Sequence, residues 1–288
     1  MSKSDSSGAP MLNAPTFRRA EAAWYGLAVV LVVTFVNSFA LWRWLDARLP
    51  AVALTAIPFV LASPIVLWAV ARLHRGVPRA RLPWIALAVA LAVVAFWITD
   101  PDFPAKRSHV AEYILLALVV RRALAFRLDG AWLGLASGLV AALLGVHDEL
   151  LQGLHPARYF GPLDLAVNGL AAAAGACLGH GVMLFDRTFA GNSAPSPRRA
   201  GDRAAWLAMA VALGALACLL VAVARLPGDP LPPWAFAPLL AAAVLWALVC
   251  LDAPVAPQPA WTAALVVWLS VAAIVEPVLA NVTPLDFR

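Results

Sequence analysis

Two short stretches of this sequence carry side chains that could perform acid–base chemistry or bind a polar ligand. The first has the pattern Lys-x-x-His-x-x-Glu-Tyr, and the second begins Asp-Glu-x-x-Gln and continues to an Arg, an Asp and an Asn. In chain order the residues are Lys106, His109, Glu112, Tyr113, Asp148, Glu149, Gln152, Arg158, Asp164 and Asn168. Because ionisable residues are costly beside a bilayer, such residues indicate a functional site by default.

The residue types divide into two expected roles. Carboxylates and histidine can exchange protons or hold a cation. The candidate catalytic residues are therefore Glu112, Glu149, Asp148 and His109. Lys and Arg can hold an anionic group, and the remaining polar side chains can orient a ligand. The candidate ligand-binding residues are Lys106, Tyr113, Gln152, Arg158, Asp164 and Asn168.

Several of these residues also have a purely structural interpretation. Asp164 lies near an expected helix start, where the helix dipole favours a negative charge. Lys106 could extend its charge to the membrane interface. Arg158 could pair with Asp148 or Glu149 and brace two helices. The sequence leaves both kinds of interpretation open.

The balance of charges around the two stretches narrows the class of ligand. Acidic residues outnumber Lys and Arg there, unlike a phosphate cradle, which favours basic residues. The balance better fits a divalent cation held by carboxylates, or an amine or sugar ligand. The sequence has no Gly-x-Ser-x-Gly elbow, His-Glu-x-x-His helix or phosphate-binding Gly loop. Any catalysis would be acid–base or metal-assisted, and the metal is not specified.

Helices must position these side chains. His109, Glu112 and Tyr113 are at i, i+3 and i+4, so they share one helical face. Glu149 and Gln152 are three positions apart, and the later Asp and Asn are four apart. We therefore expect three helices to present polar faces at one depth, where a bundle could bring them into one pocket.

The composition predicts an all-α protein that crosses a membrane many times. The chain is 63% hydrophobic and 13% charged, and a spanning helix needs about 20 mainly apolar residues. The expected spans are 22–42, 52–71, 84–99, 109–126, 131–149, 162–184, 204–224, 234–251 and 260–279. The expected fold is a polytopic transmembrane helix bundle of about nine spans.

Basic residues indicate the orientation of this bundle. With a cytoplasmic N-terminus, two thirds of the 21 Lys and Arg residues fall in cytoplasmic segments. Both polar stretches then face outward. The net charge of +5 is a topology signal, and no soluble basic face suggests nucleic-acid binding. The expected location is a bacterial cytoplasmic (inner) membrane, with the lipid bilayer as the main partner.

The chain divides into five expected segments. A disordered cytoplasmic tail covers 1–21, and a two-span lead-in covers 22–83. A four-span core with all the polar residues covers 84–184. The stretch 185–203 is rich in Gly, Ser and Pro, which indicates a cytoplasmic loop. Three more spans form a C-terminal extension, 204–288.

Small residues predict close helix packing inside the core. The fifth span has small residues at every fourth position, and the sixth has two glycines with the same spacing. In order they are Gly130, Gly134, Gly138 and Ala142, then Gly175 and Gly179. Such stripes let two backbones approach closely, so we expect the fifth and sixth spans to form a tight antiparallel hairpin through them.

The two polar stretches together resemble the VanZ-like family of small membrane proteins, over roughly residues 84–184. The likeness rests on the ten site residues in their order and spacing, with Gly169 and Gly175 after them. The resemblance implies a bacterial envelope protein linked to glycopeptide (teicoplanin) resistance, but no defined reaction. An Asp that precedes the Lys in many relatives is missing before Lys106, where Asp102 could substitute.

Three functions stay open at the level of sequence. The outward pocket could bind or modify a lipid-linked or peptidoglycan-related headgroup, as an enzyme of the envelope. It could instead serve a transporter or flippase, although a site at one membrane face rather than at the midplane argues against alternating access. The polar residues could also lock the helices of a non-catalytic scaffold for envelope assembly.

Overall fold

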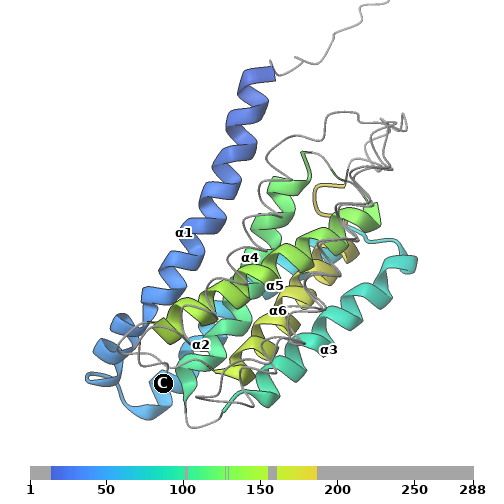
Figure 1. The fold of residues 1–288 in the computed structure, drawn as a ribbon. Coiled ribbons are helices and arrows are strands. Elements are labelled where there is room, and N and C mark those ends of the chain that lie inside the picture. The colour runs from blue at the N-terminus through green and yellow to red at the C-terminus, as the bar shows by residue number, and fades with distance from the viewer. Residues whose placement is uncertain (1–13, 101–102, 127, 129, 155–160, 187–288) are drawn as a thin grey trace, which may run out of the picture.

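The computed structural model describes residues 14–100, 103–126, 128, 130–154 and 161–186 (Figure 1). The described part contains no strand. Its elements are α1 (Ala14–Asp46), α2 (Ala51–His74), the short 3-10 helix η1 (Arg79–Arg81), α3 (Leu82–Ile98), α4 (Pro104–Leu124), α5 (Gly130–Leu154) and α6 (Pro162–Gly181). The prediction of an all-α fold is confirmed, and each of the first six expected spans coincides with one of the α-helices.

Three of the described helices are long and apolar enough to cross a membrane. They are Arg19–Asp46 within α1, Ala51–His74, and Arg79–Ile98, which combines η1 with α3. Most of their apolar side chains point away from the protein, and Val52 and Trp97 are 82% and 85% exposed. A soluble monomer rarely shows so much contiguous apolar surface, so the chain is a helical membrane protein. The spans expected at 204–279 lie outside the described residues.

The expected disordered tail was wrong for residues 14–21, because α1 begins at Ala14. The segment from 14 to 23 is rich in Ala and carries Arg and Glu, which are strong helix formers. Its proline is the second residue of the helix, where the missing N–H costs nothing. Local helix propensity therefore extends the first span toward the N-terminus.

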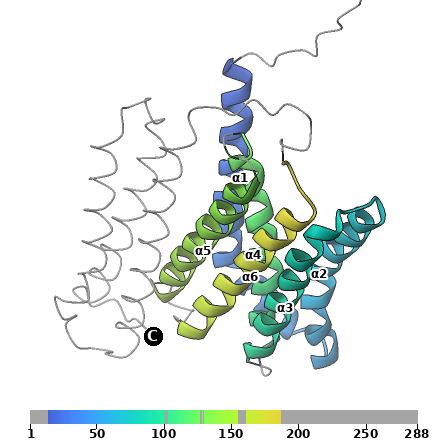
Figure 2. The ribbon, with the colours of Figure 1, turned by 90° about the vertical axis from the view of Figure 1, so that its right-hand side faces the viewer.

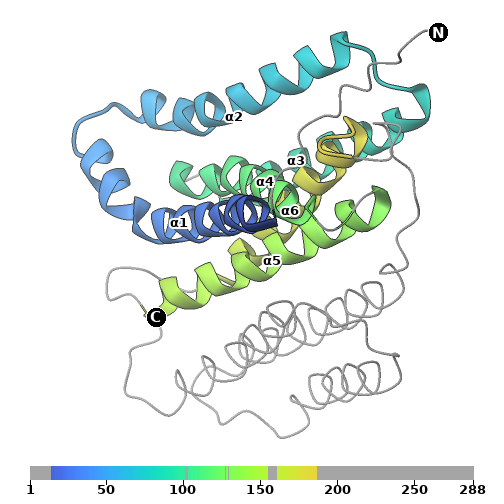
Figure 3. The same cartoon turned by 90° about the horizontal axis from the view of Figure 1, so that it is seen from above.

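α4 is the central helix of the described part. It packs against α1 and α2 on one side and against α5 and α6 on the other, and Figure 3 shows it enclosed by these four helices. Figure 2 shows α5, α4, α6 and α3 next to one another, and α6 contacts all three of the others. The helix that carries the first polar stretch is thus shielded on nearly every side.

The small-residue stripe of the fifth span packs where the sequence predicted. A Cβ added at Gly138 would lie 3.1 Å from the Cβ of Ala176, and one at Gly134 would lie 3.4 Å from the Cβ of His180. Both contacts are with α6. The stripe of α5 therefore does allow close approach of the two helices.

The glycines of α6 do not face α5, and this part of the prediction was wrong. A Cβ at Gly175 would lie 2.6 Å from the carbonyl oxygen of Ile114, and one at Gly179 would lie 2.7 Å from the Cδ of Arg121. Both neighbours belong to α4. A stripe of small residues predicts close packing, but it does not identify the helix that will use it.

Successive helices run antiparallel, so the bundle has two ends (Figure 1). At one end α1, α3 and α5 end and α2, α4 and α6 begin, and this end carries the predicted site. At the other end α2, α4 and α6 end and α3 and α5 begin. We call these the acidic end and the basic end, after the charges described below.

Candidate functional site

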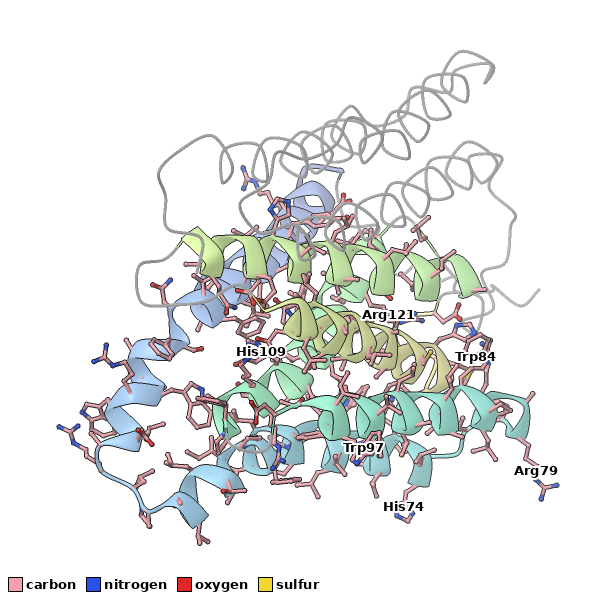
Figure 4. The ribbon with its side chains drawn as sticks, turned by 60° about the horizontal axis from the view of Figure 1, so that its bottom comes forward. His74, Arg79, Trp84, Trp97, His109 and Arg121 are labelled. Carbon is pink, nitrogen blue, oxygen red and sulfur yellow. The ribbon has the colours of Figure 1, made fainter. Side chains whose placement is uncertain are left out.

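The predicted site residues come together at the acidic end, where α4 begins, α5 ends and α6 begins. We call this group the polar cluster. Its members are Lys106, His109, Glu112, Tyr113, Asp148, Glu149, Gln152, Asp164 and Asn168. Arg158 lies outside the described residues. His109 is labelled in Figure 4, within the bundle.

Tyr113 and Asp148 form the deepest contact of the polar cluster. The Tyr113 hydroxyl donates to Asp148 Oδ2 at 2.6 Å, and neither residue is exposed to solvent. Gly145 makes this approach feasible, because a Cβ there would lie 2.9 Å from the Tyr113 ring and 3.0 Å from Asn168. Phe35 of α1 covers the same ring, with 5.8 Å between the ring centroids. The contact joins α4 to α5.

Glu149 joins α5 to the start of α6. The backbone N–H of Gly161 donates to Glu149 Oε2 at 3.2 Å. The side-chain amide of Asn168 lies 3.5 Å from both Glu149 Oε1 and the carbonyl oxygen of Gly145. Glu149 is fully buried, so these neutral donors replace the water that its carboxylate loses on folding.

His109 and Glu112 form an ion pair along α4. His109 Nδ1 lies 3.0 Å from Glu112 Oε2. Ser108, which the sequence reasoning missed, donates to Glu112 Oε1 at 3.1 Å and to the carbonyl oxygen of Ala105 at 2.7 Å. Its position four residues before Glu112 was the available signal, since such positions are neighbours on a helix.

Lys106 supplies a positive charge to the outer rim of the polar cluster. Its Nζ lies 2.9 Å from Asp164 Oδ2, and the side chains are 38% and 7% exposed. The pair joins the first turn of α4 to the first turn of α6. Asp164 therefore lies at a helix start, as its structural interpretation from the sequence expected, and it also takes part in an interhelical contact.

The centre of the polar cluster contains buried side-chain oxygens that lack a hydrogen-bond donor among the described residues. Asp148 and Glu149 are both fully buried, and neither forms an ion pair with a residue that the structure describes. Asp148 Oδ1 and Asn168 Oδ1 are buried and accept no hydrogen bond from a described residue. Because buried acceptors without donors are costly, the arrangement suits a ligand that brings N–H or O–H groups.

The arrangement of the carboxylates bears on the divalent cation that the sequence allowed. Among the described residues, no group of three His, Cys, Asp or Glu side chains is arranged to hold a metal ion. The cluster's carboxylates contact a tyrosine, a lysine, a histidine, a serine and the backbone N–H of Gly161.

Comparisons with known proteins give no relative for this chain. No family model, no curated protein and no solved structure matches it. The likeness to VanZ-like proteins rests on the motif residues alone.

Proposed function

We propose that the chain is a VanZ-like protein of the bacterial envelope that binds or modifies a lipid-linked or peptidoglycan-related headgroup at the polar cluster. The ligand would enter from the outward side of the cytoplasmic membrane. Glu112 and Glu149 would act as acid–base or ligand-coordinating groups. Lys106, at the rim, would hold an anionic part of the headgroup.

The observation that carries this proposal is the pair of adjacent, fully buried carboxylates, Asp148 and Glu149, which form no direct ion pair within the described residues. The basic group that acts on both, His109, is already paired with Glu112. A bundle that needed only to be braced would gain more from neutral or paired side chains. Sugar hydroxyls and amines supply the donors that such a centre lacks. The partly exposed Lys106 would be accessible to such a headgroup.

The competing function is that of a helix-locking scaffold, and one observation favours it. The Tyr113–Asp148, Lys106–Asp164 and Gly161–Glu149 contacts all run between helices. Such contacts fix the register of α4, α5 and α6 whether or not a ligand binds. A test must therefore distinguish an effect on envelope precursors from an effect on the stability of the protein.

The decisive experiment compares lipid-linked envelope precursors by mass spectrometry in three strains. The strains are the wild type, a deletion, and Glu149→Gln, with the variant expressed at the wild-type level. Under the proposal, one precursor changes by at least about tenfold in the deletion and in Glu149→Gln, since removal of one essential catalytic or binding group commonly costs that much.

Asp46→Asn is the matched control, because Asp46 is an exposed carboxylate at the same end of the molecule. It should leave the precursor pools unchanged. Unchanged pools in the deletion, or a Glu149→Gln variant that melts earlier yet has wild-type pools, would instead support the scaffold.

A further inference from the structure

The basic end of the bundle holds a second group of ionisable side chains, far from the polar cluster. Arg121 of α4 lies there with Arg81, His180 and Asp186. Arg121 and His109 are 12 positions apart on one helix, or about 18 Å at 1.5 Å per residue. Figure 4 shows Arg121 displaced from His109 toward Trp84.

Arg121 is the largest fully buried side chain of the described part, at 0% exposure. Its Nε donates to the carbonyl oxygen of Leu184 at 2.7 Å. Both remaining nitrogens of the guanidinium, Nη1 and Nη2, are buried and have no hydrogen-bond partner among the described residues. Arg121 forms no ion pair within the described residues. Four donor hydrogens thus lie inside the protein without an acceptor in the part of the chain that the structure describes.

The backbone around Arg121 is shaped to hold it. Gly179 leaves the space that the stem of Arg121 occupies, because an added Cβ would lie 2.7 Å from Arg121 Cδ. After α6 the chain turns through Met183 and Phe185, which have φ angles of 53° and 60°. Positive φ is unfavourable for such side chains. This turn presents the Leu184 carbonyl to Arg121, and it brings Asp186 Oδ1 within 3.3 Å of the Gly130 N–H.

The neighbouring groups do not neutralise Arg121. Arg81 donates to the Nε2 of His180, and since a guanidinium cannot accept, that ring nitrogen must be the acceptor and the ring neutral. Arg81 therefore adds positive charge. Asp186 is the negative group that acts on Arg121, but without a direct ion pair. The balance of charge at this point is positive.

A guanidinium stays protonated in proteins, so burial cannot be relieved by loss of its proton. An unpaired buried charge lowers the stability of the folded protein by several kcal/mol, and a bound anion would offset this loss. The planar fork of Arg matches two oxygens of a phosphate. Basic sites between helices on the cytoplasmic side of membrane proteins bind lipid phosphates in this way.

We propose that Arg121, with Arg81 beside it, forms a phosphate-binding site between α3, α4 and α6 at the basic end, separate from the polar cluster. The ligand chemistry is a phosphate group, carried either by an anionic lipid headgroup or by a soluble molecule. Arg121 makes the bidentate contact through Nη1 and Nη2. Arg81 contributes charge from the rim.

The test measures thermal unfolding of the full-length protein in neutral detergent by tryptophan fluorescence. Inorganic phosphate is titrated against chloride at constant ionic strength, so that screening is equal. We expect phosphate to raise the wild-type Tm by about 5 °C or more at saturation. Arg121→Met should lose this shift while it folds with a Tm near that of the phosphate-free wild type.

Arg79→Gln is the matched control, since Arg79 is exposed on η1 at the same end (Figure 4). It removes one positive charge and should keep the full shift. Gly179→Ala keeps all charges but displaces Arg121, so it should reduce the shift. It also serves as the test if Arg121→Met does not fold.

The source of the phosphate is separated by lipid additions to the same samples. A shift with phosphatidylglycerol but not with inorganic phosphate or phosphatidylcholine assigns the site to a lipid headgroup. A shift with inorganic phosphate assigns it to soluble phosphate compounds. If neither anion raises the wild-type Tm, or if all variants shift alike, the site does not exist and Asp186 alone balances Arg121.

Discussion

At the residue scale, the most notable feature of the described part is a set of polar side chains that are buried away from water. A buried donor or acceptor that keeps a partner adds about 0.5–1.5 kcal/mol of stability, whereas one left alone costs about 1–3 kcal/mol. Tyr113 is the clearest case, because its buried hydroxyl donates to Asp148 Oδ2 at 2.6 Å.

Tyr113→Phe should destabilise the protein by about 1–3 kcal/mol, since it removes this hydrogen-bond donor from the buried Asp148 carboxylate. The ring contact with Phe35 would be kept, so the loss measures the hydroxyl. The measurement is thermal unfolding in detergent of Tyr113→Phe, Asp148→Asn and the double variant. Strict additivity of the two single changes would contradict the pairing, because contacting residues couple.

At the element scale, the described bundle is organised by close approaches between helix backbones. Gly175 lies against the backbone of Ile114, and Gly179 lies against Arg121. α6 therefore packs close to α4 through its glycines and to α5 through its alanines. The two clusters at the opposite ends of α4 are both held by this one packing arrangement.

Gly175→Ala should destabilise the bundle by about 1–3 kcal/mol, because its Cβ would meet the Ile114 carbonyl oxygen at 2.6 Å and the helices would have to move apart. Gly169→Ala is the control on the same helix, since its Cβ would meet no atom within 4 Å. It should be neutral or stabilising by up to about 1 kcal/mol. Thermal unfolding checks both, and equal losses would argue against the α4–α6 contact.

Helix periodicity made the α-helices and the shared depth of the polar cluster predictable. For example, the spacing of His109, Glu112 and Tyr113 is enough to place them on one helical face. The partner of each glycine was not predictable, because spacing along α6 does not distinguish α4 from α5. The group around Arg121 that we propose as a phosphate site was also missed, since its residues come from three separated parts of the chain and its arginines were interpreted as an orientation signal.

At the scale of the whole molecule, the two ends of the described bundle differ in charge. The end with the polar cluster holds the carboxylates Glu112, Asp148, Glu149 and Asp164. The other end holds the arginines of α2, η1 and the last turn of α4, which are Arg72, Arg75, Arg79, Arg81, Arg121 and Arg122. Basic residues favour the cytoplasmic side, so we expect the polar cluster to face outward.

Cysteine labelling tests this orientation. The three native cysteines are first replaced. Asp46→Cys should then react with a membrane-impermeant maleimide added to cells whose outer membrane is permeabilised and whose cytoplasmic membrane is intact. Arg79→Cys should react only after the cytoplasmic membrane is opened. Both positions are exposed and lie at opposite ends. The reverse pattern would put the polar cluster in the cytoplasm and rule out a headgroup site at the outer face.

The central position of α4 has a consequence for how the protein is made. α4 carries two charged residues in its first turn, Glu112 within it and two arginines in its last turn, and each such charge opposes insertion by up to about 2.5–3.5 kcal/mol at the centre of a span. On its own this helix would partition poorly from the translocon into lipid. Its Tyr113 and Lys106 contact Asp148 of α5 and Asp164 of α6, and its Arg121 donates to the Leu184 carbonyl after α6, all of which emerge from the ribosome later. α4 should therefore wait at the translocon until its C-terminal neighbours arrive, and the three helices should enter the bilayer as one unit.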